Sequence, residues 1–153
     1  MSDWFSIKGK VALVTGGSRG IGEMIATGFL KHGAKVYISS RKADVCEATA
    51  ARLQEQYGGI CLSVPSDLST TEGIGNVVST INDNETGLDI LVNNAGSTWG
   101  APLGDFPEAG WDKVMDTNVK GLFFLTQELL PLLRARATDD EPTRVINIGS
   151  IDG

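Results

Sequence analysis

The sequence is organised around the stretch Thr15-Gly16-Gly17-Ser18-Arg19-Gly20-Ile21-Gly22. Before it runs Lys10–Val14, a short apolar and partly β-branched segment of the kind that forms a buried strand. After it, Glu23–His32 predicts a helix, because apolar or small residues recur at helical spacing, namely Ile21, Ile25, Gly28 and Phe29. The quoted stretch is therefore expected to be a tight turn that joins a strand to a helix.

This turn offers a backbone surface suited to phosphate. Its glycines lack the side chains that would hold a ligand away from the backbone. The start of the following helix adds unpaired N–H groups and the positive end of the helix dipole. The residues expected to bind a dinucleotide pyrophosphate are Gly16, Ser18, Arg19, Gly20, Ile21 and Gly22. The spacing differs from the commoner G-x-G-x-x-G, and a tight turn without a ligand is the alternative.

The same residues also match a second motif. Gly16–Gly20 fits G-x-S-x-G, the nucleophile elbow of α/β-hydrolases, which also lies between a strand and a helix. That chemistry needs a histidine base late in the chain. The only histidine, His32, follows Ser18 too closely, and a polar residue at a helix end explains it better. The hydrolase is therefore disfavoured.

Composition predicts one globular domain over residues 1–153. Hydrophobic residues make up 41% and charged residues 21% of the chain, which is ordinary for a packed core. The net charge is −6 and no Lys/Arg cluster exceeds a pair, which argues against a nucleic-acid partner. Cys46 and Cys61 are too few for a disulfide framework. With no signal peptide and no apolar run of membrane-spanning length, a cytoplasmic location without membrane contact is expected, and no metal site is predicted.

Strands and helices are expected to alternate along the whole chain. Further strands are predicted at residues 35–39, 60–64, 88–93 and 144–148. Helices are predicted from Ala43 to Gln56, from a cap at Ser69 or Thr70 to about Asn82, and from Pro107 or Glu108 to Arg136 with a break near Asn118. In the helix after residue 43, the inward positions are expected to be Val45, Ala48, Leu53 and Tyr57. This alternation is typical of a doubly wound parallel α/β sheet.

The end of the second predicted strand bears on cofactor choice. It reads Ser39-Ser40-Arg41-Lys42, where an NAD site usually places an acidic residue against the ribose 2′-hydroxyl. Ser40, Arg41 and Arg19 would instead suit a 2′-phosphate, because a guanidinium pairs with phosphate and a carboxylate would repel it. NADP is therefore favoured over NAD, with a solvated surface cation as the alternative for Arg41. A methyltransferase of similar fold is disfavoured, since its cofactor lacks these phosphates.

Taken together, the motifs resemble the short-chain dehydrogenase/reductase family, and within it the 3-oxoacyl-acyl-carrier-protein reductase type, especially that of bacterial rhamnolipid synthesis. The matching stretches cover the chain in order: residues 15–22, Asp67-Leu68, Asn93-Asn94-Ala95-Gly96, Asn118-Val119-Lys120-Gly121 and Asn147-Ile148-Gly149-Ser150. Two flanking segments, residues 5–10 and 98–101, support the closer match. The resemblance implies a Rossmann fold, here with its first five strands, and NADP-dependent reduction of a carbonyl, most naturally a 3-oxoacyl thioester.

The resemblance also implies roles for single residues. Asp67 would accept from the adenine amino group beside Leu68, although a helix-capping aspartate would look the same. Asn94, Ala95 and Gly96 would lie against the adenosine ribose. Asn118 would hold a water of the proton relay, or be only a satisfied core amide, and Ser150 would polarise the substrate carbonyl. The family's subunit interfaces imply a homo-oligomer, a dimer or a tetramer, for the full-length form.

One expected group is missing from these residues. The family's proton donor is a tyrosine followed four residues later by a lysine. Here the tyrosines are Tyr37 and Tyr57, and Arg41 and Cys61 stand four residues beyond them. The sequence is therefore interpreted as the N-terminal part of a longer reductase, truncated before that segment and unable to catalyse reduction alone. A non-catalytic nucleotide-binding module or a pseudogene product is the alternative.

Overall fold

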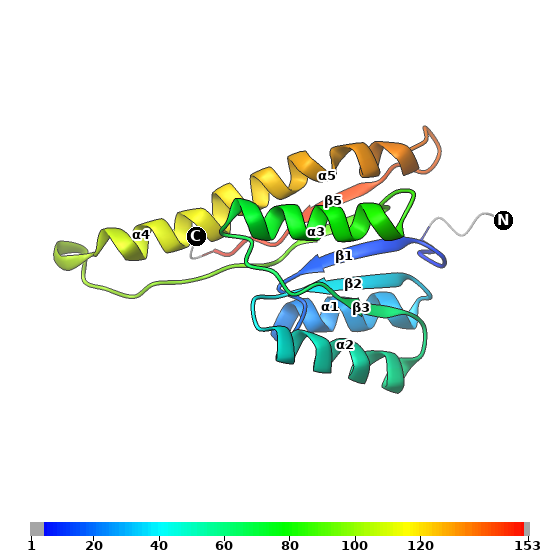
Figure 1. Cartoon of the computed structure of the whole chain (residues 1–153), viewed down its shortest axis with the longest axis horizontal. Helices are drawn as coiled ribbons and strands as arrows, with labels where there is room; N and C mark the ends of the chain where they lie inside the picture. Colours follow the sequence, from blue (N-terminus) through cyan, green and yellow to red (C-terminus); the bar gives the residue numbers. More distant parts are fainter. Residues whose placement is uncertain (1–4, 152–153) are drawn as a thin grey trace.

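A computed structural model describes residues 5–151 and contains one parallel sheet of five strands. The strands are β1 (Val11–Thr15), β2 (Lys35–Ser39), β3 (Cys61–Ser63), β4 (Ile90–Asn93) and β5 (Arg144–Asn147). Their spatial order is β3-β2-β1-β4-β5, and every neighbouring pair is parallel. The helices are α1 (Gly20–Lys31), α2 (Ala43–Tyr57), α3 (Thr71–Asn84), α4 (Glu108–Met115) and α5 (Leu122–Arg136). The predicted doubly wound sheet is confirmed (Figure 1).

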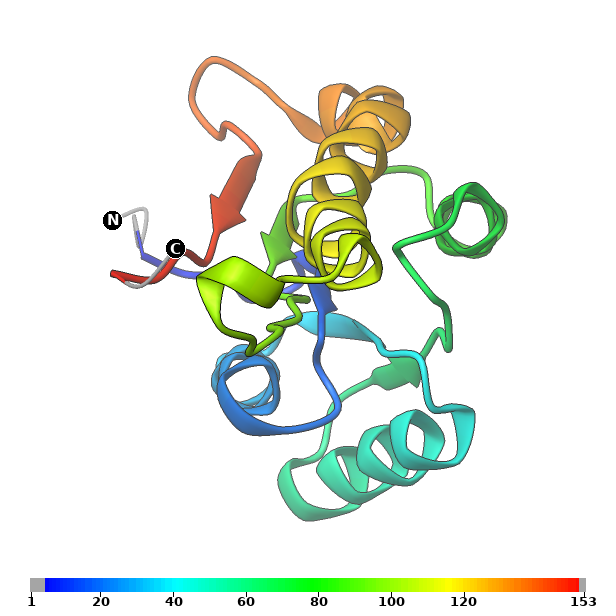
Figure 2. The same cartoon turned by 90° about the vertical axis from the view of Figure 1, so that its left-hand side faces the viewer.

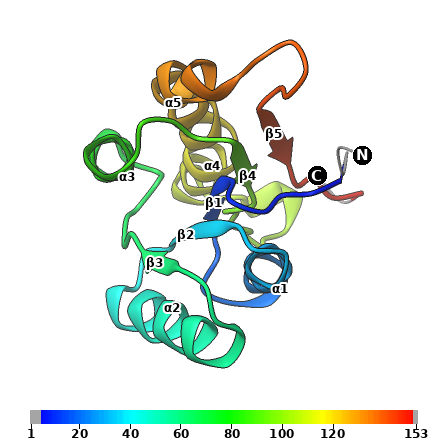
Figure 3. The same ribbon diagram turned by 90° about the vertical axis from the view of Figure 1, so that its right-hand side faces the viewer.

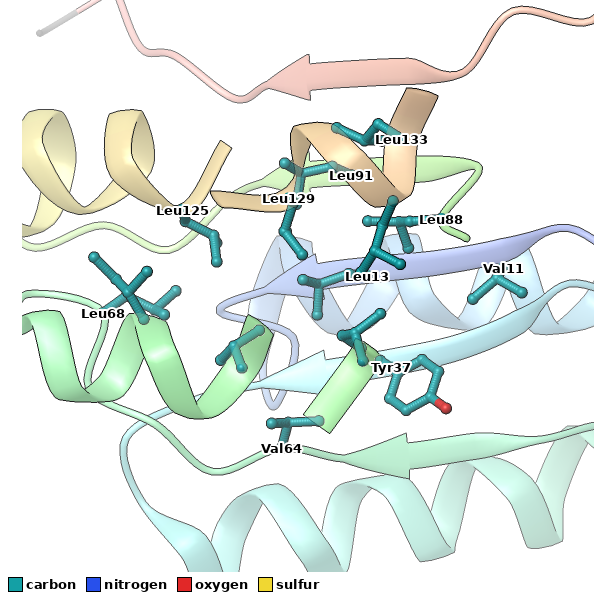
Figure 4. Close-up of a cluster of buried hydrophobic side chains, with 14 residues drawn as sticks. Val11, Leu13, Tyr37, Val64, Leu68, Leu88, Leu91, Leu125, Leu129 and Leu133 are labelled. Atoms are coloured by element: carbon teal, nitrogen blue, oxygen red, sulfur yellow. The ribbon is translucent and has the colours of Figure 1, made fainter. Parts of the chain in front are cut away.

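Helices cover both faces of the sheet. On one face, α1 and α2 pack against alternate strand residues such as Ala12, Val14 and Ile38. On the other face, α3 and α5 pack against the intervening residues, including Leu13 and Tyr37. The views from either end show the sheet between these two layers (Figures 2 and 3). Figure 4 shows the second core, where the leucines of α5 face the sheet.

The strand order reverses between β1 and β4. The chain leaves β1 toward β2 and β3, then crosses back to β4 on the other side. In open α/β sheets, ligands bind at the carboxyl ends of the strands at such a reversal. The glycine-rich turn begins there, directly after Thr15, and Asn94 follows the end of β4. The topology therefore brings the predicted site residues together at the carboxyl ends of the strands.

Helix boundaries follow the prediction closely, whereas helix faces do so less well. Thr70 caps α3, since its Oγ1 accepts from the Gly73 N–H at 3.0 Å. The first helix begins at Gly20, three residues before the expected start at Glu23. In α2 the prediction was wrong for Val45 and Ala48, which are exposed, while Leu53 is buried as expected. The buried residues of α2 are Leu53 and three small ones: Cys46, Thr49 and Ala50.

The break expected near Asn118 is a π-helix. It spans Asp116–Gly121 and joins α4 to α5 without a turn between them. Such a bulge inserts one residue into the helical hydrogen-bond ladder and is common at functional sites. A short 3-10 helix, η1 (Leu103–Asp105), lies in the connection between β4 and α4. Within residues 5–151, no helix combines the length and apolarity needed to cross a membrane.

Candidate functional site

The backbone of the glycine-rich turn approaches its neighbours too closely for side chains. A Cβ at Gly22 would lie 2.2 Å from the carbonyl oxygen of Gly16. A Cβ at Gly16 would lie 2.9 Å from Asn94 Nδ2, and the φ of Gly16 is +63°. Asn94 Nδ2 in turn donates to the carbonyls of Thr15 and Gly16, at 3.1 and 3.3 Å. The predicted residues Gly16, Gly22 and Asn94 are therefore packed against one another.

The start of α1 provides backbone donors. Gly20 has a φ of +55°, and a Cβ built there would meet nothing within 4 Å, so space is open above it. Within residues 5–151, no acceptor contacts the N–H groups of Ser18, Arg19 and Gly20. Arg19 is the extended N-cap of α1, and its side chain is exposed, as is that of Ile21 at 60%. Unpaired N–H groups and the helix dipole make this end of α1 suited to an anion.

The end of β2 lies beside this turn. The Gly17 N–H donates to the Ser39 carbonyl at 3.1 Å, which joins the turn to β2. The side-chain hydroxyls of Ser39 and Ser40 are buried and have no hydrogen-bond partner within the described chain. Arg41 is exposed immediately after them. The exposed guanidinium offers charge-assisted donors of the kind that pair with a phosphorylated ribose, whereas both serine hydroxyls are enclosed by the protein.

Two glycines of neighbouring helical segments approach the backbone of the segment after β3 closely. A Cβ at Gly73 of α3 would lie 1.9 Å from the Asp67 carbonyl oxygen, and one at Gly121 would lie 2.1 Å from that of Leu68. Asp67 Oδ1 accepts from the N–H and the hydroxyl of Ser69, at 3.0 and 2.7 Å, while its side chain remains exposed. Leu68 is buried in the core. This geometry fixes the position of Asp67 and agrees with a local turn-stabilising role as well as with a ligand contact.

Thr15 joins the turn to the end of β4, a role that motif reasoning missed. Its hydroxyl donates to the Val92 carbonyl and accepts from the N–H groups of Asn94 and Ala95, at 2.9 Å each. Thr15 is 1% exposed, so these bonds are shielded from water. The signal was present in the quoted stretch, since a threonine at a strand end has a hydroxyl suited to bridging two backbones.

Asn118 clamps the loop after β4 to the π-helix. Its Oδ1 accepts from the Ser97 N–H at 2.8 Å, and its Nδ2 donates to the Ser97 carbonyl at 2.9 Å. A Cβ at Gly96 would lie 3.6 Å from the same Oδ1, so Gly96 and Asn118 are brought together. The side-chain amide of Asn118 is thus satisfied by backbone, but the residue is exposed and is not the core amide that was one of the two expectations.

Ser150 lies just beyond β5, at the same edge of the sheet. The Ile148 N–H donates to the Asn93 carbonyl at 3.0 Å and continues the ladder toward Ser150. Asn93 Nδ2 also donates to Asn147 Oδ1 at 2.9 Å and to Thr126 Oγ1 at 3.0 Å. These side chains join β4, β5 and α5. Asn93 and Asn147 stood in the quoted motifs, but only the strand register reveals that they pair.

A doubly wound parallel sheet with a glycine-lined turn at its reversal defines a nucleotide-binding α/β architecture. The family model described as short chain dehydrogenase matches residues 10–153. The chain therefore belongs to the short-chain dehydrogenase family.

Relatives at several distances support this membership. The chain is 50% identical over its whole length to the rhamnolipids biosynthesis 3-oxoacyl-[acyl-carrier-protein] reductase of Pseudomonas aeruginosa, of which it covers 59%. It is 37% identical over 146 residues, 95% of its length, to the chicken (Gallus gallus) dehydrogenase/reductase SDR family member 11, of which it covers 56%. The predicted resemblance to the rhamnolipid-type reductase is thus confirmed. The chain spans less than two thirds of the length of either relative.

Solved structures agree with the fold. The P. aeruginosa RhlG/NADP active-site complex superposes with a TM-score of 0.92 at 51% identity, covering 98% of this chain and 58% of that one. The L-sorbose reductase of Gluconobacter frateurii, complexed with NADPH and L-sorbose, gives a TM-score of 0.89 at 36% identity, with 95% and 54% coverage. The five strands described here therefore correspond to a part of each of these longer folds.

Proposed function

We propose that this chain forms the NADP(H)-binding part of a carbonyl reductase. The observation that supports it most is the start of α1, where the N–H groups of Ser18, Arg19 and Gly20 have no acceptor in the described chain and face open space at Gly20. The pyrophosphate would lie against these donors. Ser40, Arg41 and Arg19 would contact the 2′-phosphate, and Asp67, Leu68, Asn94, Ala95 and Gly96 would contact the adenosine. The relatives whose structures contain NADP or NADPH add independent support.

The substrate proposed is a 3-oxoacyl thioester, by analogy with the P. aeruginosa 3-oxoacyl-[acyl-carrier-protein] reductase, to which the chain is 50% identical. Bound NADPH supplies a hydride for a carbonyl carbon. Ser150 would donate a hydrogen bond to the carbonyl oxygen and stabilise the charge that develops there. Asn118, at the π-helix, would keep the neighbouring backbone in place for a water of the proton relay. The full-length form is proposed to be cytoplasmic and homo-oligomeric.

Proton donation requires a group that these residues lack. Tyr37 is 1% exposed, and its hydroxyl is bonded to Glu85 in the interior. Tyr57 lies at the end of α2. We therefore expect residues 1–153 alone to show no NADPH oxidation with a short-chain 3-oxoacyl thioester, followed as absorbance at 340 nm. Measurable turnover by these residues alone would contradict the expectation that they lack the proton donor.

Cofactor binding is tested by titration of the full-length form with NADPH and NADH. We expect NADPH to bind more tightly, and Arg41→Ala to weaken NADPH roughly tenfold with little change for NADH, because a charge-assisted bond to phosphate is lost. Lys31→Ala, at the far end of α1, serves as a control for the loss of one positive charge. Failure of the wild-type protein to bind either nucleotide would contradict the proposed function and the nucleotide-binding module alike.

A further inference from the structure

The phosphate-binding turn has a partner on a neighbouring helix. The carbonyl of Ser18, in the middle of the turn, accepts a hydrogen bond from Thr49 Oγ1 of α2 at 3.0 Å. Both residues are buried, with exposed fractions of 8% for Ser18 and 5% for Thr49. Within residues 5–151, it is the only hydrogen bond from α2 to the backbone of the turn, and Thr49 lies 31 positions along the chain from Ser18. The bond therefore depends on the tertiary packing of α1 beside α2.

The bond fixes the orientation of one peptide unit. The peptide that joins Ser18 to Arg19 is trans and planar, so its C=O and its N–H point in opposite directions. Because the Ser18 carbonyl points to α2, the Arg19 N–H points away from α2. That N–H has no acceptor within residues 5–151. A carbonyl left unbonded could turn toward the ligand side, where it would repel a phosphate.

A second contact joins α2 to the start of α1. Arg52 of α2 forms an ion pair with Glu23 in the first turn of α1, at 2.8 Å. The Glu23 N–H donates to the Arg19 carbonyl at 3.3 Å, which continues α1 from its cap. Glu23 and Arg52 are both partly exposed, so this pair contributes less than the buried Thr49 bond. Both contacts nevertheless act in the same sense, since each ties the start of α1 to α2.

We propose that Thr49 is a positioning residue for nucleotide binding: its hydroxyl holds the Ser18–Arg19 peptide so that the Arg19 N–H and side chain face the phosphates. This inference rests on the proposed function. It assigns to α2 a part in binding that none of its residues was predicted to have. Since Arg19 is proposed to contact the 2′-phosphate, the positioning by Thr49 is expected to matter more for NADPH than for NADH.

The test compares Thr49→Val, which keeps the shape and removes the hydroxyl, with Thr49→Ser, which keeps the hydroxyl. In the full-length form, we expect Thr49→Val to raise the Kd for NADPH roughly five- to tenfold, and the Kd for NADH less, because a buried carbonyl loses its donor. Thr49→Ser should bind NADPH within about twofold of wild type. Thr80→Val is the matched control, since Thr80 Oγ1 also donates to a backbone carbonyl, that of Asn76, but on α3.

The possible outcomes distinguish a failure of the positioning role of Thr49 from a failure of the proposed function. A merely structural role for Thr49 would lower the Tm and leave the ratio of the two dissociation constants unchanged, which would overturn the inference. Unchanged NADPH binding by Thr49→Val, or failure of Thr49→Ser to restore it, would do the same. Wild-type protein that binds neither nucleotide would instead overturn the proposed function, and this inference with it.

Discussion

At the scale of single residues, the most unusual group outside the site is the buried hydroxyl of Tyr37. It donates to Glu85 Oε1 at 2.5 Å, and Lys35 forms an ion pair with the same carboxylate. Burial, with the hydrogen bond and the charge of Glu85, raises the pKa of Tyr37 well above its usual value near 10. The three side chains join β2 to the end of α3, where Glu85 is the C-cap.

This raised pKa predicts how stability depends on pH. The unfolded chain releases the tyrosine proton near pH 10, while the folded chain retains it, so the stabilisation is complete below that pH and is lost as pH rises above it. We expect the contribution of Tyr37 to the free energy of unfolding to fall by roughly 1 kcal/mol between pH 8 and pH 10.5. Urea denaturation at both pH values should show a fall that is about 1 kcal/mol larger in wild type than in Tyr37→Phe.

The control for this measurement is Tyr57→Phe. The Tyr57 ring lies 4.7 Å from Lys31 Nζ and is bonded to no carboxylate in the part of the chain described. Cys61, whose pKa is raised to about 11 by burial and by Cys46, titrates in the same range and is present in all three proteins. The comparison therefore cancels its effect. Equal pH dependence in wild type and Tyr37→Phe would contradict the prediction.

At the scale of elements, the sequence best predicted the features that depend on local backbone preferences. The turn after β1, the Thr70 cap and the break near Asn118 each followed from residue types with strong local preferences. The buried face of α2 did not, because three of its four buried residues are small and its apolar Val45 is 37% exposed. The Thr49–Ser18 bond had no local signal either, since only the packing of two helices creates it.

The π-helix leads to a prediction about Gly121. A Cβ there would lie 2.1 Å from the Leu68 carbonyl oxygen and 2.9 Å from that of Asp116, both of them backbone atoms. Gly121→Ala should therefore force the π-helix away from the segment after β3, lowering the free energy of unfolding by about 3 kcal/mol. Gly75→Ala in α3, where a Cβ meets nothing within 4 Å, should instead be neutral or stabilising by up to about 1 kcal/mol.

Chemical denaturation of the two glycine variants beside wild type measures the difference. The contrast isolates the close approach, because both changes add the same methyl group to a helical glycine. If Gly121→Ala were as stable as Gly75→Ala, the contact between the π-helix and Leu68 would not exist as described.

At the scale of the whole molecule, the sheet has an exposed edge strand, β5. In the described chain, β5 pairs only with β4, and all four of its residues are exposed. Val145, Ile146 and Ile148 are each about 40% exposed, at 42%, 39% and 40%. By register, Val145 lies beside Leu91 and Ile146 beside Val92, so the two side chains belong to opposite faces. An edge strand that is apolar on both faces is a template for pairing with another chain.

We therefore expect residues 1–153, produced alone, to self-associate through β5, with light scattering that rises with protein concentration. Ile146→Lys should raise the concentration at which scattering begins by roughly fivefold, since a charge on an edge strand opposes pairing. The control is Met24→Lys, at a position 72% exposed on α1. Either substitution moves the net charge from −6 to −5, toward zero, so a gain in solubility from charge alone is not expected. An equal effect of the two variants would show that association does not proceed through the edge of the sheet.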